Sequence, residues 1–164
     1  METWFTAVLH ALALPQYGLA TLFVVALLSA TLLPLGSEPL LIGLLHVNPA
    51  LFWPAVITAS VGNTLGGAIT YATGFYARRA WTRLARKASP AVAHPRAHAW
   101  LARWGAPACV LAWLPVVGDP LCAVAGWLEL PLLRCVGWMA LGKFLRYLAI
   151  SAIALRLAPA WFGG

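Results

Sequence analysis

Hydrophobic residues in this chain come in long blocks, separated by prolines, glycines and one polar stretch. Three mainly apolar blocks cover residues 19–33, 50–76 and 132–157. A hydrocarbon solvent offers no hydrogen-bond partner to backbone N–H and C=O groups, so blocks of this length are expected to be helical. The pattern therefore predicts an all-α integral membrane protein.

The composition supports this prediction. Hydrophobic residues make up 62% of the 164 residues, charged residues make up 9%, and the mean hydropathy is +0.83. These values lie outside the range of soluble globular domains, and the length suits one domain. The first residues lack the basic start and the cleavage site of a signal peptide, so we expect them to be retained.

The positive charge is concentrated in one polar stretch. The formal net charge is +7, and seven of the eleven Lys and Arg residues fall within 77–104. Basic residues beside apolar blocks mark cytoplasmic loops of membrane proteins, so we place this stretch in the cytoplasm and expect no nucleic-acid partner. Basic residues within 77–88 follow helical spacing, which predicts an amphipathic helix on an anionic leaflet; a solvated loop is the alternative.

Two short motifs repeat an unusual arrangement, an acid between two prolines. The first reads LPLGSEPL at 33–40 and the second reads LPVVGDPL at 114–121, so that Glu38 and Asp119 take the same place. The prolines that shape the two turns are Pro34 and Pro39 in the first motif and Pro115 and Pro120 in the second. Because proline ends a helix but suits its first turn, each motif is predicted to be a helix end, a tight turn and a helix start.

The arms beside each motif are too short to cross a bilayer. At ~1.5 Å per residue, ~10–16 residues reach only part of a ~30 Å hydrocarbon core, so re-entrant hairpins fit better than full spans. One complete span, at 50–76, separates the hairpins and inverts the second. We therefore predict one membrane domain with an inverted-repeat, transporter-like fold: two opposed re-entrant helical hairpins and full transmembrane helices. Repeat one covers about 17–76 and repeat two about 105–157, with the cytoplasmic basic segment 77–104 between them.

The two acids are candidate functional groups because a charge at the bilayer centre is costly, by ~2.5–3.5 kcal/mol on insertion scales. One interpretation is structural: each carboxylate caps its own half-helix. The other builds on it, because a helix N-terminus also suits a phosphate. On this hypothesis Glu38 and Asp119 titrate, and their protonated forms favour a lipid phosphate, which couples its movement to protons.

Counter-charges within the apolar blocks are few. Arg146 and Lys143 lie three residues apart in the last block, and Arg134 lies near its start. Arginine presents a planar group that matches phosphate oxygens, so Arg146 is expected either to bind a phosphate or to pair with one of the two acids. Arg134 is expected either to bind a phosphate or to extend to the membrane–water interface. The side-chain amide of Asn63 falls within the predicted membrane span, where it needs a hydrogen-bond partner, and a hairpin tip would offer one. The glycines around it are expected to allow close helix packing.

Four stretches resemble the DedA family, also called the VTT or SNARE-associated Golgi protein superfamily, and in particular its short YqaA-like bacterial branch. They read LLPLGSEPLL, GNTLGGAITYATGFYARRA, WLPVVGDPLCAVAGWLELP and GKFLRY. The resemblance implies a multi-pass protein of the bacterial inner membrane that moves lipids between leaflets, with undecaprenyl phosphate as substrate and possible coupling to protons. It also implies a functional role for Arg134 and Arg146, because bacterial members carry important arginines after their second hairpin.

Other function classes remain as alternatives. Within transport, these are a non-selective lipid scramblase and a proton-coupled carrier of small solutes. An enzyme is not expected, because the sequence holds no nucleophile with a paired base and no cluster of metal ligands, and we expect no metal and no cofactor. An assembly factor would not need paired intramembrane acids. The expected partners are polyprenyl phosphate, anionic phospholipids and protons, and the sequence is compatible with a homo-oligomer.

Overall fold

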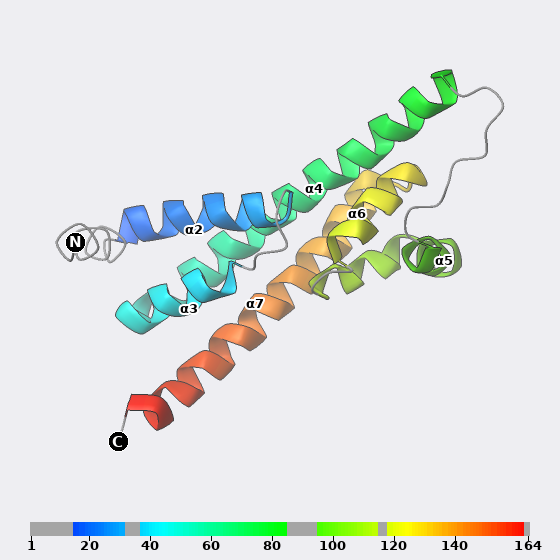
Figure 1. The fold of residues 1–164 in the computed structure, drawn as a ribbon. Helices are drawn as coiled ribbons and strands as arrows, with labels where there is room; N and C mark the ends of the chain where they lie inside the picture. Colours follow the sequence, from blue (N-terminus) through cyan, green and yellow to red (C-terminus); the bar gives the residue numbers. More distant parts are fainter. Residues whose placement is uncertain (1–14, 32–36, 85–94, 115–117, 163–164) are drawn as a thin grey trace.

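The computed structural model describes residues 15–31, 37–84, 95–114 and 118–162. Every regular element in these ranges is helical, as predicted: α2 (Pro15–Ser29), α3 (Glu38–Val47), η1 (Pro49–Leu51), α4 (Phe52–Leu84), α5 (Pro95–Trp104), η2 (Ala106–Trp113), α6 (Gly118–Trp127) and α7 (Leu132–Phe162). The two longest helices, α4 and α7, run in opposite directions and form the centre of the molecule (Figure 1).

The shorter helices pack on the central pair from both ends. α2 packs on α4, and α3 contacts α7. At the other end, α6 packs on α4 while η2 packs on α7, and α5 contacts α6 and η2 (Figure 1). Each central helix therefore contacts elements from both motif regions. The inverted relation of the repeats and the re-entrant course of the hairpins stay predictions, because the turns at 32–36 and 115–117, with Pro34 and Pro115, lie outside the described residues.

Close packing of α2 on α4 depends on glycine. A Cβ atom on Gly62 would lie 2.6 Å from the carbonyl oxygen of Phe23, and one on Gly66 would lie 2.6 Å from the Cβ of Ala30. No real side chain tolerates such distances, so the small residues of α4 admit the neighbouring backbone. The packing role predicted for these glycines is confirmed.

Helix α4 is longer than the sequence pattern indicated. It was expected to end near residue 76 and instead continues to Leu84, so that residues 77–84 extend α4 in place of starting a separate surface helix. No proline or glycine interrupts the chain between 75 and 89, which allows the helix to continue. Arg78 then donates a 2.7 Å hydrogen bond to the carbonyl of Trp127 at the end of α6.

One helical stretch meets the length and composition of a membrane span among the described residues. This stretch, Leu132–Arg156 of α7, is 25 residues long, which corresponds to ~37 Å and exceeds the ~30 Å hydrocarbon core. The 33 residues of α4 are long enough, but the helix carries many glycines, hydroxyl residues and terminal arginines, and it does not pass the same composition test.

Two apolar clusters fill the interior. One lies among α4, α6, η2 and the first half of α7 and includes Tyr71, Cys122 and Met139. The other lies among α2, α3, the first half of α4 and the second half of α7 and includes Tyr147. The three cysteines, Cys109, Cys122 and Cys135, are buried and form no disulfide, so they act as small packing residues.

Candidate functional site

The candidate cations come from one helix, α7, which brings two of them into the interior. Lys143 is buried, at 1% exposure, and Arg146 is partly buried one turn further along. Arg134 lies exposed in the first turn of α7, ~18 Å along the helix from Arg146. The structure therefore places Lys143 and Arg146 together and leaves Arg134 outside this group.

Glu38 forms an ion pair with Arg146, and this pair joins α3 to α7. Glu38 is the first residue of α3, and Pro39 follows it in the first turn. The side chains are 17% and 21% exposed, so both charges are largely withdrawn from solvent. The N-cap residue Ser37 makes no side-chain capping bond. Of the two partners open for Arg146, phosphate or acid, the structure shows the acid.

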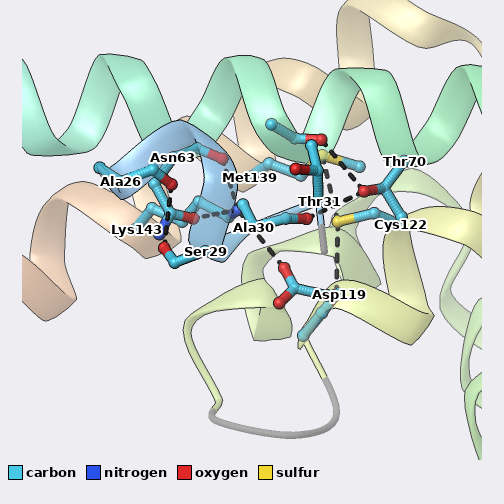
Figure 2. Close-up of polar contacts among 12 residues, drawn as sticks. Ala26, Ser29, Ala30, Thr31, Asn63, Thr70, Asp119, Cys122, Met139 and Lys143 are labelled. Carbon is cyan, nitrogen blue, oxygen red and sulfur yellow. Dashed lines mark hydrogen bonds and ion pairs between the residues drawn. The ribbon is translucent and has the colours of Figure 1, made fainter. Parts of the chain in front are cut away.

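Asp119 meets the other cation. Its carboxylate lies 3.7 Å from the Lys143 Nζ, and its side chain is 41% exposed against 2% for that of Lys143. The ammonium group also donates to Asn63, to the backbone carbonyl at 2.7 Å and to the side-chain Oδ1 (Figure 2). Gly67 leaves room for it, because a Cβ there would lie 3.1 Å from Nζ. Three oxygen atoms thus surround one buried ammonium group.

The described partners of Asn63 lie on α7, where its Nδ2 donates a 2.7 Å hydrogen bond to the Tyr147 hydroxyl. Its expected contact with a hairpin tip stays a prediction, because the turns at 32–36 and 115–117 lie outside the described residues. The Tyr147 hydroxyl in turn lies 2.6 Å from the Oγ of Ser37, which is the residue before Glu38. Within the part of the first motif that the structure describes, the amide is linked to Ser37 through this tyrosine.

Tyr147 and Ser37 are site residues that the sequence reasoning missed. Ser37 stands inside the first acidic motif, and Tyr147 closes the stretch GKFLRY, four residues after Lys143. Residues four apart share a helix face, and Met139, Lys143, Tyr147 and Ser151 are all buried at 0–1% exposure. A polar pair at that spacing in an apolar helix was the signal that could have identified Tyr147.

A groove of about 460 Å³ opens beside Arg146. Its lining comes from η2 and α7: Val110, Trp113, Gly142, Leu145, Arg146, Ala149 and Ile150. Among the described residues that line the groove, Arg146 is the one charged side chain, and the others are apolar or glycine. The groove therefore combines a guanidinium group with an apolar wall.

A second groove, of about 560 Å³, lies between α4 and α7. It is lined by Ile57, Ser60, Val61, Thr64, Leu65, Ala140, Leu141 and Phe144, so its wall has hydroxyl groups but no charge. The two grooves use different faces of α7, with Leu145 in the first and Leu141 in the second. Only the first combines an apolar wall with a charged side chain.

Comparison with known proteins identifies relatives over most of the chain. The VTT domain family matches residues 33–154. The inner membrane protein YqaA of Escherichia coli is 38% identical over 145 residues, which cover 88% of this chain and 96% of that protein. An uncharacterized protein of Haemophilus influenzae is 35% identical over 144 residues, or 81% of this chain and 85% of that protein. No solved structure matches the chain significantly.

Proposed function

The chain belongs to the VTT domain family, also called the DedA family, and is a bacterial inner membrane protein; we propose that it carries a lipid phosphate between the two leaflets, with undecaprenyl phosphate as the substrate. The observation that carries this proposal is the Arg146 groove, where one guanidinium group meets an otherwise apolar wall. A polyprenyl phosphate has the complementary make-up, an anionic head on a long hydrocarbon chain.

Arginine suits the head group better than any other side chain. Its planar fork donates two parallel hydrogen bonds to phosphate oxygens, and it stays charged at every relevant pH. In a site with 21% side-chain exposure, such a contact is screened less than at the surface. The hydrocarbon chain would lie along Leu145, Ala149 and Ile150, which line the same groove on α7 as Arg146.

Glu38 would regulate access to this cation. While its carboxylate is ionised, it neutralises Arg146 and repels a phosphate. A proton on Glu38 removes the negative charge and leaves the guanidinium group with an unpaired charge, which is costly in a partly buried site. A lipid phosphate then replaces the carboxylate. Proton binding and lipid binding would thereby favour each other, which is the basis of proton-coupled movement.

We propose a carrier and not an enzyme. Arg146, the one ionisable group among the described lining residues, carries a guanidinium that stays charged, so it binds anions but serves neither as a nucleophile nor as a general base. The uncharged groove between α4 and α7 favours the alternative, a non-selective scramblase, because its wall suits hydrocarbon chains of any lipid.

The test measures transbilayer movement in proteoliposomes with two labelled lipids. Undecaprenyl phosphate is the substrate, and a zwitterionic phospholipid is the control. The proposal predicts movement of the polyprenyl phosphate at a rate at least ~10-fold above that of the control lipid. Equal rates for both lipids would establish the scramblase instead, and movement of neither would contradict lipid transport.

A further inference from the structure

A line of one ion pair and three hydrogen bonds links the two acidic motifs through the middle of the molecule. It starts at Asp119, passes Lys143 and Asn63, reaches the Tyr147 hydroxyl and ends at Ser37, next to Glu38. We propose that Tyr147 and Asn63 are positioning residues that couple the two motifs, so that the Asp119–Lys143 pair sets the position of the Glu38–Arg146 pair. The link to lipid movement rests on the proposed function; the coupling itself does not.

The geometry allows every donor along this line to point the same way. The Lys143 ammonium group has only donors, so it fixes Oδ1 of Asn63 on its side and turns Nδ2 toward Tyr147. The Tyr147 oxygen accepts from Nδ2, and its own hydrogen is then free to be donated to the Ser37 Oγ at 2.6 Å. Aligned hydrogen bonds polarise and strengthen one another, so the line responds as a unit.

Burial makes the line rigid. Tyr147 is fully buried, and Lys143 and Ser37 are each 1% exposed. A buried polar group that loses its partner cannot turn to water, so a shift at one member moves the next. The line also lies at the boundary between the two apolar clusters, since Lys143 stands on α7 between Met139 of one cluster and Tyr147 of the other.

The far end of the line adjoins both partners of the Glu38–Arg146 ion pair. Ser37 precedes Glu38, and Tyr147 follows Arg146 in the sequence. Any displacement of the Ser37–Tyr147 contact therefore displaces the ion pair beside it. The line transmits position and not protons, because the Asn63 amide accepts on one atom and donates from another and has no hydroxyl or imidazole to relay a proton.

Asp119 is the group that sets the state of the line. Among the described residues it is the one acid that pairs with the buried Lys143. Loss of its charge leaves a buried ammonium group with only the neutral oxygens of Asn63, which is unfavourable. The resulting change in the Lys143–Asn63 contact reaches Ser37 through Tyr147.

A double-mutant cycle tests this coupling without a transport assay. The melting temperature of the purified protein is measured for wild type, Asp119→Asn, Glu38→Gln and the double variant. Residues without a shared partner usually act additively. We expect a departure from additivity of at least ~2 °C in the wild-type background, and none in the Tyr147→Phe background, which keeps the ring and removes only the hydroxyl.

Tyr71 provides a matched control. It is also buried, and its hydroxyl donates to the Leu130 carbonyl, away from the line. Tyr71→Phe therefore removes a buried hydrogen bond but should leave the coupling intact. If Tyr147→Phe does not fold, Ser37→Ala breaks the line at its other end and decides the question. Additivity in the wild type, or coupling that survives both Tyr147→Phe and Ser37→Ala, would overturn the proposal, whereas a wild type that moves no lipid phosphate would overturn only the proposed function.

Discussion

At the scale of single residues, the chain places one guanidinium group where it meets both an acid and an apolar groove. Glu38 and Arg146 are mostly buried, with about a fifth of each side chain exposed, and Arg146 lines the groove. Lys143, by contrast, is enclosed by Asn63 and Asp119. Arg146 is thus the cation that is available to an external anion.

Replacement of Arg146 tests this assignment. We expect Arg146→Ala to slow transbilayer movement of undecaprenyl phosphate at least ~100-fold, because the charge-assisted bonds to the phosphate are lost. Arg146→Lys keeps the charge but not the fork, so an intermediate rate is expected. Arg156→Ala is the control, since Arg156 lies exposed on the same helix outside the groove lining. Equal losses in both alanine variants would show that a general loss of positive charge explains the effect.

The pH dependence of binding follows from the Glu38–Arg146 pair. As the pH falls, Glu38 takes up a proton, its negative charge disappears and the affinity for lipid phosphate should rise. Glu38→Gln mimics the protonated form, so its affinity at neutral pH should equal that of the wild type at low pH and should change less with pH. Titration of the lipid itself is common to both proteins. Microscale thermophoresis in detergent measures the affinities, and identical pH profiles would exclude this role of Glu38.

At the scale of elements, α7 organises the site through the spacing of its side chains. Its buried face carries Cys135, Met139, Lys143, Tyr147 and Ser151, each four residues after the last. The neighbouring face carries Arg146 and lines the groove with Leu145 and Ala149. One rigid helix thereby holds the buried polar line and the partly buried Arg146 in fixed register.

Two glycines of α7, Gly142 and Gly137, distinguish the effect of close packing on stability from the effect of helix propensity. A Cβ on Gly142 would collide with the backbone carbonyl of Val110 in η2, whereas a Cβ on Gly137 meets nothing within 4 Å. We expect Gly142→Ala to lower the melting temperature by several degrees through this overlap. Gly137→Ala should leave it unchanged or raise it slightly, since alanine gains up to ~1 kcal/mol in a helix. Similar shifts in the two variants would contradict the close contact between η2 and α7.

Two leucines of α7 allow the roles of the two grooves to be tested separately. Leu145 lines the groove beside Arg146, and Leu141 lines the uncharged groove against α4; both are about half exposed. Leu145→Trp should fill the first groove and slow the movement of undecaprenyl phosphate at least ~10-fold, because the hydrocarbon chain loses its wall. Leu141→Trp should leave the rate within a factor of ~2 of the wild type. The reverse pattern would assign transport to the second groove.

Helix existence could be predicted from the sequence more fully than helix ends. The apolar blocks indicated α2, α4 and α7, and the acid–proline motifs indicated the starts of α3 and α6. The end of α4 was misjudged, because the change from apolar to basic residues near 77 marks a change of surroundings and not a break in the backbone. Propensity alone does not stop a helix at such a boundary.

At the scale of the whole molecule, two apolar clusters meet at a polar layer formed by α4 and α7. Asn63, Lys143 and Tyr147 lie in this layer, and each motif region contributes one residue to it, Ser37 or Asp119. The layer explains why a chain this apolar retains buried polar groups, since their contacts hold the helices of the two clusters in one fixed alignment.

The composition of the site could be predicted in part, and its pairing could not. The sequence indicated Glu38, Asp119, Lys143, Arg146 and Asn63, which the structure brings to one region, and it also indicated Arg134, which lies elsewhere. Which acid meets which cation depends on how α3 and α6 pack on α7. Such long-range packing leaves no trace in local spacing, and the line through Tyr147 was missed for the same reason.

The central claim is that the Arg146 guanidinium binds a lipid phosphate when Glu38 carries no charge. Solid-state NMR in proteoliposomes measures it directly, as the dipolar coupling between the lipid phosphorus and isotopically labelled arginine side-chain nitrogens. Glu38→Gln with undecaprenyl phosphate should show a strong coupling, and Glu38→Gln/Arg146→Lys should show none. A coupling that persists unchanged without Arg146 would place the phosphate at another arginine and contradict the claim.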